Sequence, residues 1–173
     1  GVRPEVRQRV LHVADSLGYR PNAAARNLAR GSAGVIGFVL PSAQLSLNRY
    51  GTSLVQAVAD AVQRHDYGLM LHLDDDQPGR DVTRFVRSGA IDGVLLSSLA
   101  VGTPWAEELL ELCPSSVIIG GNSARPDYHT VQVECTEATA ALVAHLYEQG
   151  RRRIGYVGGR RSRFDARRRF DGY

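Results

Sequence analysis

The stretch GYRPNAAARNLARG at residues 18–31 combines residue types that suit binding to a polyanion. It is polar and rich in alanine, and it carries one large apolar side chain, Leu28. Residues 23–30 are expected to form a short helix on which Arg26 and Arg30 flank this leucine. Minor-groove DNA-binding proteins insert an apolar wedge between base steps and place cations on the flanking phosphates. Leu28 fits that use, and it also fits a side chain that covers the edge of the next domain beside solvated arginines.

A second group of polar side chains follows the predicted strands. Ligands of open α/β sheets bind beyond the carboxyl ends of the strands, and hydroxyls, amides and carboxylates there suit a polyol or sugar. Ordinary polar loops would have the same composition, so that alternative stays open. The residues concerned are Ser42, Gln44, Asp74 to Asp76, Ser97, Ser98 and Asn122.

Hydrophobic periodicity predicts the elements that position these groups. A first helix begins at Pro4 and ends before Gly18, and a second short helix ends at a linker, residues 31–34. Apolar runs of strand length then alternate with amphipathic helical stretches, which predicts an α/β fold with a parallel sheet covered on both faces. Strands are predicted at 35–40, 68–73, 91–96, 116–120, 129–133 and 153–158. Helices are predicted around 54–62, 80–88, 104–112 and 136–149, with another beginning near Asp165.

Composition bounds the class of protein. A chain of 173 residues with 43% hydrophobic content can bury one substantial core. No apolar run approaches the ~20 residues that span a bilayer, and no charged-then-apolar leader opens the chain, so we expect a cytoplasmic protein without a membrane partner. Cys113 and Cys135 have neither metal-ligand nor CxxC spacing, which predicts buried or idle thiols.

No catalytic pattern is present in the sequence. The five histidines have no ligand spacing, no serine or cysteine stands in a nucleophile elbow, and Gly158-Gly159 lacks the residues of a phosphate-binding loop. The three aspartates at 74–76 could hold Mg²⁺, although adjacent acids in a loop are usually solvated. We therefore predict that the chain is not an enzyme and uses no cofactor or metal.

The charge is divided along the chain. All 21 basic residues are arginine. The net charge is +4 over residues 1–31, −8 over residues 32–150 and +7 over residues 151–173. A basic arm before an acidic globule predicts a polyanion-binding appendage on a domain with another role.

Three segments, in order along the chain, resemble the lactose-repressor (LacI/GalR) family of bacterial transcription factors. VRPEVRQRVLHVADSLGYRPNAAARNLARG, with VIGFVLP after it, resembles the end of the family's headpiece, its GYxPNxxARxL hinge and its first strand. HLYEQGRRRIGYVGG is similar to the family's HLxxLGHRRIxxxxG, and ARRRFDGY to its ARxRxxGY.

The resemblance implies a fold and a domain organisation. It implies a periplasmic-binding-protein-like fold of parallel sheets with helices on both faces, after the end of a helical DNA-binding headpiece and a hinge helix. The headpiece of the family begins with a helix-turn-helix, so we expect this chain to be a fragment without the first two headpiece helices and most of the C-terminal subdomain. The implied parts are a last headpiece helix (1–20), hinge helix and linker (21–34), N-terminal subdomain of the effector-binding domain (35–133) and start of the C-terminal subdomain (134–173).

The resemblance also implies DNA contacts. In the family, two hinge helices of a homodimer pair in the minor groove and bend the operator, and the leucine that matches Leu28 is the wedge. Arg3 and Val6 stand where the family usually has Ser and Thr on phosphate; Arg3 keeps a cation there, whereas Val6 cannot bind phosphate. The implied DNA-binding residues are Arg3, Tyr19, Asn22, Ala25, Arg26, Leu28 and Ala29.

On the effector side, Arg169 matches a family arginine that reaches into the cleft, and Asp165 lies near another contact position. The loop at 41–53 is longer than usual for the family, VEC at 133–135 replaces VDN, and Gly120 stands where Asp is common. These departures leave the ligand open. The candidate effector residues are Ser42, Gln44, Asp74, Ser97, Asn122, Asp165 and Arg169.

The sequence supports two candidate functions. The first is a sequence-specific DNA-binding regulator, a repressor, that acts as a homodimer on double-stranded operator DNA under the control of a sugar-like small-molecule effector. The alternative is a solute-binding or sugar-binding α/β module without a DNA role. The basic segment at residues 1–31 discriminates between them, since a binding module without a DNA role does not need such a segment.

Overall fold

A computed structural model describes most of the chain, namely residues 2–20, 27, 29, 31–47, 49–73, 80–97, 104–121 and 128–173. The chain divides into two compact units, residues 1–33 and 34–173, and each is described by itself. Among the described residues, no helix combines the length and apolar character needed to cross a membrane.

The first unit contains helix α1, which spans Pro4–Ser16. Proline stands in the first turn, where its missing N–H costs nothing. The helix ends because Gly18 takes a φ of +63°, and the N–H groups of Gly18 and Tyr19 donate to carbonyls of the last turn. No residue of α1 is buried. The predicted helix is therefore confirmed.

The second unit is built on one parallel sheet with strand order β2-β1-β3-β4-β5. The strands β1 and β3 lie in the middle of the sheet and carry most of its buried side chains. The predicted α/β class with a parallel sheet is confirmed. The strands span Val35–Leu40 (β1), Gly68–Leu73 (β2), Gly93–Ser97 (β3), Ser116–Ile119 (β4) and His129–Val131 (β5).

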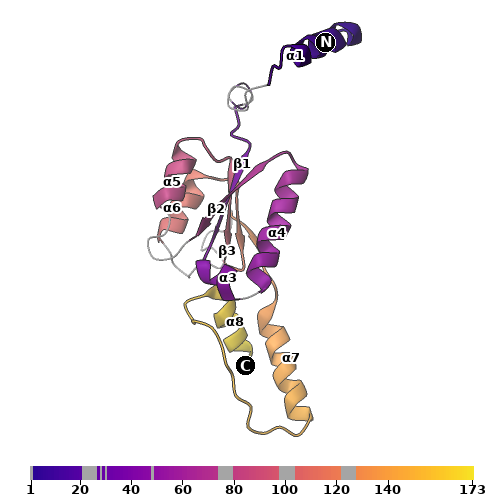
Figure 1. The fold of residues 1–173 in the computed structure, drawn as a ribbon. Coiled ribbons are helices and arrows are strands. Elements are labelled where there is room, and N and C mark those ends of the chain that lie inside the picture. The colour runs from indigo at the N-terminus through magenta and orange to yellow at the C-terminus, as the bar shows by residue number, and fades with distance from the viewer. Residues whose placement is uncertain are drawn as a thin grey trace. The chain divides into compact units, whose positions relative to one another are not determined.

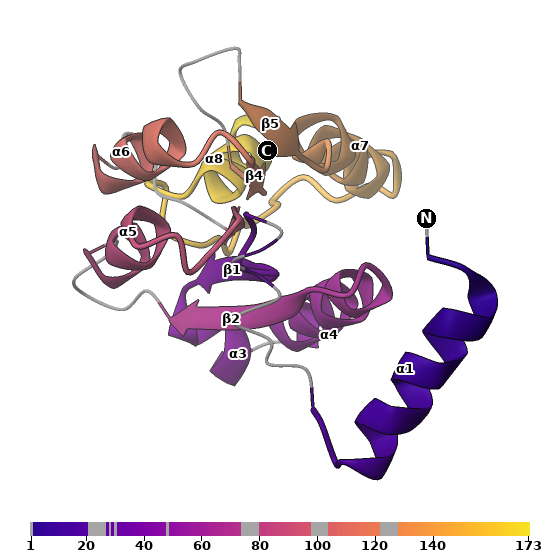
Figure 2. The same ribbon diagram turned by 90° about the horizontal axis from the view of Figure 1, so that it is seen from above.

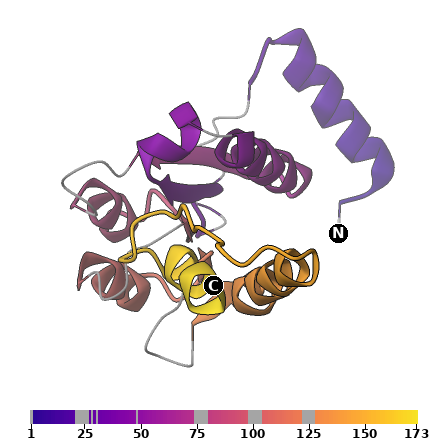
Figure 3. The ribbon, with the colours of Figure 1, turned by 90° about the horizontal axis from the view of Figure 1, so that it is seen from below.

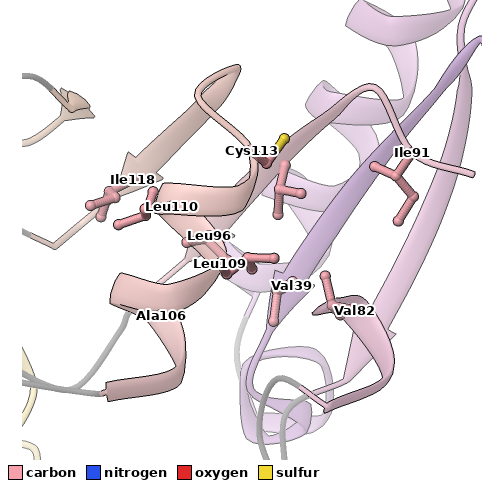
Figure 4. Close-up of a cluster of buried hydrophobic side chains, with 10 residues drawn as sticks. Val39, Val82, Ile91, Leu96, Ala106, Leu109, Leu110, Cys113 and Ile118 are labelled. Atoms are coloured by element: carbon pink, nitrogen blue, oxygen red, sulfur yellow. The ribbon is translucent and has the colours of Figure 1, made fainter. Parts of the chain in front are cut away.

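Helices cover both faces of this sheet (Figures 1 and 2). On one face, α5 and α6 pack over a cluster that includes Val82, Leu96 and Leu109, which Figure 4 shows. On the other face, Val58 of α4 packs on Phe38 and Leu40 of β1. The helices of the unit span Ser42–Leu47 (α3), Arg49–Arg64 (α4), Arg80–Arg87 (α5), Pro104–Leu112 (α6), Cys135–Glu148 (α7) and Phe164–Gly172 (α8).

The single tryptophan of the chain, Trp105, belongs to the α6 side of the core. It is half-buried and packs against the cluster of α5 and α6 side chains. Its indole nitrogen is buried and has no hydrogen-bond partner among the described residues. The ring is therefore held by apolar packing.

The predicted strand at 153–158 is wrong. Residues 151–160 form no regular element, and the side chain of Val157 is fully exposed. A strand needs a neighbour to pair with, and no segment of the described chain runs beside this one. Its backbone is held instead by Tyr173, whose hydroxyl donates to the carbonyl of Ile154 at 2.7 Å.

Two further predictions are corrected near the carboxyl ends of the strands. The expected long loop after the first strand contains helix α3, because Leu45 packs on the cluster around Phe38. The strand predicted to reach residue 133 ends at Val131, because the Gln132 side-chain amide turns back and donates to the carbonyl of Gly121 at 2.9 Å.

Candidate ligand-binding site

A cavity of about 1250 Å³ lies where β1, β4 and β5 end, facing α8. In Figure 3 the strands are seen from their carboxyl side, with α8 in front of them. One side of the cavity, which we call the sheet wall, is formed by Pro41, Ser42, Ala43, Gln44, Tyr50, Ile119, Gly120 and Val131. Its second side is the arginine wall: Arg160, Arg163, Phe164, Asp165, Ala166, Arg168 and Arg169. The remaining lining residues are Gly159; Gln132 and Val133, which lie between β5 and α7; and Cys135 at the start of α7.

The sheet wall is positioned by packing. Gln44 follows the buried end of β1, and Gly51 of α4 lies against its backbone. A Cβ at Gly51 would stand 2.0 Å from the Gln44 carbonyl oxygen, so no larger residue fits there without movement. The buried Ser97 donates its hydroxyl to the Gln44 side-chain oxygen at 3.2 Å. Gln44 is therefore held at its backbone by the close approach of Gly51 and at its side-chain oxygen by Ser97.

The arginine wall is positioned by charge. On α8, Arg169 donates to Asp165 at 2.9 Å, a pair four residues apart on one helix face. The same guanidinium lies 3.9 Å from the sulfur of Cys135. Partial burial by itself would lower the pKa of Arg169, but the Asp165 carboxylate and Cys135 hold it above its ordinary value. Arg169 is therefore a permanent cation at the cavity.

Arg168 connects α8 to the chain between β5 and α7. It forms an ion pair with Glu134 and donates to the Thr136 hydroxyl at 3.1 Å and to the Gln132 side-chain oxygen at 3.5 Å. Glu134 also caps α7 by accepting from the backbone N–H groups of Thr136 at 2.9 Å and Glu137 at 3.4 Å. One guanidinium thus ties together three positions of this connection.

The charge of Glu134 depends on these contacts. Desolvation acts to raise the pKa of its carboxyl group, but the Thr136 N–H, the Arg168 guanidinium and the Glu137 N–H together hold that pKa below its ordinary value. Glu134 is therefore ionised at neutral pH, where both the cap and the ion pair need it.

A close approach of α8 to α7 sets the position of the arginine wall. Gly172 lies near the end of α8, and a Cβ there would stand 2.2 Å from the carbonyl oxygen of Thr136. Beside it, Tyr156, Phe170 and Tyr173 form a ring cluster with centroid separations of 5.2 to 6.3 Å. The guanidinium of Arg161 lies 3.6 Å from the centroid of Phe170.

The structure brings four of the candidate effector residues to this cavity: Ser42, Gln44, Asp165 and Arg169. Ser97 does not line it and acts on it through Gln44. Asp74 and Asn122 lie outside the described residues. The contact of each with a ligand stays a prediction.

Other lining residues were not predicted from the sequence. Three are arginines, Arg160, Arg163 and Arg168, and the dense run of arginine after residue 150 is the signal that could have found them. Tyr50, in the first turn of α4, also lines the cavity. Cys135, expected to be an idle thiol, lies at the cavity beside Arg169, whereas Cys113 is buried as expected.

The candidate DNA-binding residues are only partly described. Arg3 and Tyr19 are exposed beyond opposite ends of α1, which is roughly 20 Å long. Ala29 is helical and exposed. Asn22, Ala25, Arg26 and Leu28 lie outside the described residues.

No group of three or more His, Cys, Asp or Glu side chains that could hold a metal ion occurs in the described part of the chain. The cavity is lined by guanidinium, hydroxyl and amide groups, which bind polar organic ligands or anions.

Comparison with curated proteins finds bacterial regulators, and no family model matches the chain. Catabolite control protein A of Staphylococcus xylosus is 28% identical over 164 residues, which are 91% of this chain and 48% of that protein. The same protein of Staphylococcus aureus is 28% identical over 169 residues, 94% of this chain and 49% of that protein. The chain thus spans about half the length of the curated relatives it matches.

Comparison with solved structures finds the same fold. The lac repressor dimer bound to operator and the anti-inducer ONPF has a TM-score of 0.78 at 18% identity, over 99% of this chain and 52% of that one. A complex of the regulator CelR with cellobiose has a TM-score of 0.72 at 21% identity, over 99% and 52%. The Cra regulator of Pseudomonas putida with fructose 1-phosphate has a TM-score of 0.69 at 22% identity, over 81% and 52%.

Proposed function

Since this chain belongs to the LacI/GalR family of bacterial transcriptional regulators, we propose that it forms part of a sequence-specific DNA-binding repressor under effector control. The effector is a sugar or a related metabolite that fills the cavity between the sheet wall and the arginine wall. The protein acts by binding and not by catalysis, and it works in the cytoplasm, where its operator lies.

The observation that carries this proposal is the cavity at the carboxyl ends of the strands, which gathers four candidate effector residues from distant parts of the sequence. Ligands of open α/β sheets bind at this edge. Two of the structural neighbours hold sugars, cellobiose in one and fructose 1-phosphate in the other. We carry that ligand class to this chain as part of the proposal.

Regulation in this proposal is a linkage between two sites. A ligand that binds both walls favours one arrangement of the unit that holds them, and that arrangement changes how two copies of the chain present residues 21–30 to DNA. By reciprocity, operator binding changes effector affinity by the same factor. A coupling free energy of about 1–3 kcal/mol is typical of such systems.

The DNA-binding part of the proposal assigns Leu28 as the minor-groove wedge of a homodimer, with Arg26 on phosphate. Support comes from the net charge of +4 over residues 1–31 and from the exposed Arg3 and Tyr19 around α1. A basic segment of this kind binds the phosphates of DNA, and an apolar side chain inserted between base steps bends the duplex.

The test is DNA binding by the full-length protein to a duplex selected from a random pool. We expect Leu28→Ala to weaken specific binding about 10- to 100-fold. The dependence of affinity on salt should not change, because an apolar side chain neutralises no phosphate and so releases no counterions from the DNA. Arg26→Gln, the matched control for charge, should instead reduce the slope of log affinity against log salt by about 1.

Two results would contradict the proposal. Equal affinity of wild type and Leu28→Ala would mean that the leucine packs on its own protein. Failure of the full-length protein to enrich any duplex sequence would leave the alternative, a sugar-binding module without a DNA role.

A further inference from the structure

We propose that Arg168, together with Gln132 and Glu134, forms a polar latch that fastens helix α8 to the end of strand β4. The latch sets the position of the arginine wall, and its opening or closing changes how tightly the protein binds DNA. The second part rests on the proposed function, because it names the contacts through which the cavity acts on DNA binding. The latch itself is independent of that function and is tested separately.

The side chain of Gln132 bridges the sheet and α8. Its amide nitrogen donates to the carbonyl of Gly121, just beyond β4, at 2.9 Å. Its side-chain oxygen accepts from Nη1 of Arg168 at 3.5 Å. Gly121 is buried, so the sheet end of this bridge is fixed, whereas Arg168 is carried by α8. A movement of α8 away from β4 therefore breaks one of these two contacts.

The guanidinium of Arg168 makes a contact at each of its three nitrogens. Nη2 pairs with Glu134, Nε donates to the hydroxyl of Thr136 at 3.1 Å, and Nη1 donates to Gln132. A guanidinium donates in a rigid planar fork, so these contacts are made in one orientation of α8 and are lost together. A lysine has a single ammonium group in place of the fork, so it would keep at most the pair with Glu134.

The resemblance to the family does not supply the residues of this latch. The pattern ARxRxxGY leaves the position of Arg168 unspecified, VEC places Glu134 where VDN has Asp, and Gly120 stands where Asp is common. The structure gathers these positions in one network. Gly120 takes a φ of +65°, which favours glycine, directly before Gly121, whose carbonyl accepts from Gln132. Three features of this chain that lie far apart in the sequence therefore belong together.

The latch faces the cavity and is weak enough to open. Gln132 and Arg168 both line the cavity, so a ligand there competes for their hydrogen bonds or adds to them. The side chains of Arg168 and Glu134 are 28% and 46% exposed, and each contact in such a place shifts an equilibrium by only about 2- to 10-fold. Ala166 is the one buried residue of α7 and α8, which the structure describes in full. Binding of one ligand is therefore enough to open or close the latch.

Amide hydrogen exchange of the full-length protein tests the latch itself, because it detects local opening. Arg168→Gln removes the three contacts, so residues 129–139 and helix α8 should exchange about 10- to 100-fold faster. Strands β1 and β3 should not change, because they lie in the buried middle of the sheet. Gln132→Ala should give a smaller increase in the same segments. The double variant should fall short of the product of the two single effects, since both residues belong to one bridge.

Affinity for a DNA duplex tests the coupling. The duplex is selected from a random pool by the wild-type protein. A residue that only supports the fold would leave this affinity unchanged in a variant that stays folded. We expect Arg168→Gln to change it about 5-fold or more, the lower end of typical couplings, and Arg168→Lys to lie between that variant and wild type. The sign of the change shows whether the closed or the open latch favours DNA binding.

Arg167→Gln is the matched control. Arg167 lies beside Arg168 on the same helix, does not line the cavity and is 66% exposed. Its replacement should leave exchange and DNA affinity within about 2-fold of wild type. Should circular dichroism show that Arg168→Gln does not fold, Arg168→Lys and Gln132→Ala carry both measurements.

Three results would overturn the proposal. Unchanged exchange in Arg168→Gln and Gln132→Ala would remove the latch. Faster exchange with unchanged DNA affinity would make the network a support of α8 without a regulatory role, and equal effects in the Arg167→Gln control would make them effects of general charge. Failure of the wild-type protein to enrich any duplex is instead a failure of the proposed function, and hydrogen exchange then still decides whether the latch exists.

Discussion

The two walls of the cavity are held in place by different forces. Behind the sheet wall, Phe38 and Leu40 are completely buried, and the buried Ser97 fixes Gln44 through one hydrogen bond. Behind the arginine wall, α7 has no buried residue and α8 has one, Ala166. Ion pairs, a helix cap and a cluster of aromatic rings do the corresponding work there.

The difference indicates which wall can respond to a ligand. Interior packing is dense and tolerates little change in shape, so the sheet wall offers a fixed surface. Exposed ion pairs contribute little stability each and rearrange easily. We therefore expect the arginine wall to adapt to the ligand, and the sheet wall to keep its form.

The largest expected effect separates two phenylalanines, one behind each wall. Phe38→Ala should lower the free energy of unfolding by about 3–5 kcal/mol, because it opens a cavity in a filled core. Phe170→Ala should cost less, roughly 1–2 kcal/mol, since Phe170 is half-buried and loses ring contacts and a cation–π contact with Arg161. Urea unfolding of the full-length variants measures both. Equal losses would remove the distinction between the walls.

An effect of intermediate size is expected at two glycines that lie against backbone carbonyl groups, one behind each wall of the cavity. Gly51→Ala and Gly172→Ala each place a methyl group inside contact distance of a carbonyl oxygen, on Gln44 and Thr136 respectively. We expect each to cost about 1–3 kcal/mol by overpacking and to weaken ligand binding, because Gln44 or α8 must shift. Gly155→Ala is the control, since nothing lies within 4 Å of its added Cβ. Unfolding midpoints and calorimetric affinities that match the control would contradict the close approaches.

The smallest effect concerns pH and the connection to α7. The pKa of Glu134 is lower in the folded chain than its ordinary value of 4.5, so its ion pair and cap stabilise the fold above that value and are lost as pH falls through the lowered pKa. Glu134→Gln should melt at a lower temperature than wild type at pH 7. The two should converge as the pH falls through the lowered pKa of Glu134, because the wild-type carboxyl group then becomes protonated.

The matched control for this experiment is Asp171→Asn. Asp171 is exposed and lies 4.0 Å from Arg167, at the limit of an ion pair. Its replacement should leave the melting temperature nearly unchanged at each pH. A Glu134→Gln variant that still melts below wild type in acid would contradict this account. It would show that the packing of the Glu134 side chain, and not its charge, holds the connection from β5 to α7.

The sheet was predictable from the sequence because its signal is local. Runs such as VIGFVL and GLMLHL are apolar, are bounded by glycine or polar residues, and match β1 and β2 at both ends. The RIGYVG run has the same texture but forms no strand, since a strand depends on a partner and not on its own residues alone. Length of apolar run therefore predicted strands only where a neighbour was available.

The site was only partly predictable. Ser42 and Gln44 follow β1 directly, so the rule for strand ends placed them, and Arg169 came from the resemblance. Cys135, Arg160 and Arg168 reach the cavity because α8 packs back on the start of α7, a contact between segments roughly 30 residues apart. No local pattern encodes that approach apart from Gly172, whose missing side chain permits it.

The lone tryptophan gives the molecule a built-in optical label for one of its two parts. Trp105 sits in the packing between α6 and the strands and does not line the cavity, whereas the aromatic phenol at the cavity is Tyr50. Indole emission should therefore follow melting of the sheet core and stay nearly constant while a ligand fills the cavity. A fluorescence titration of the unlabelled protein would then be silent to binding, even at saturating ligand.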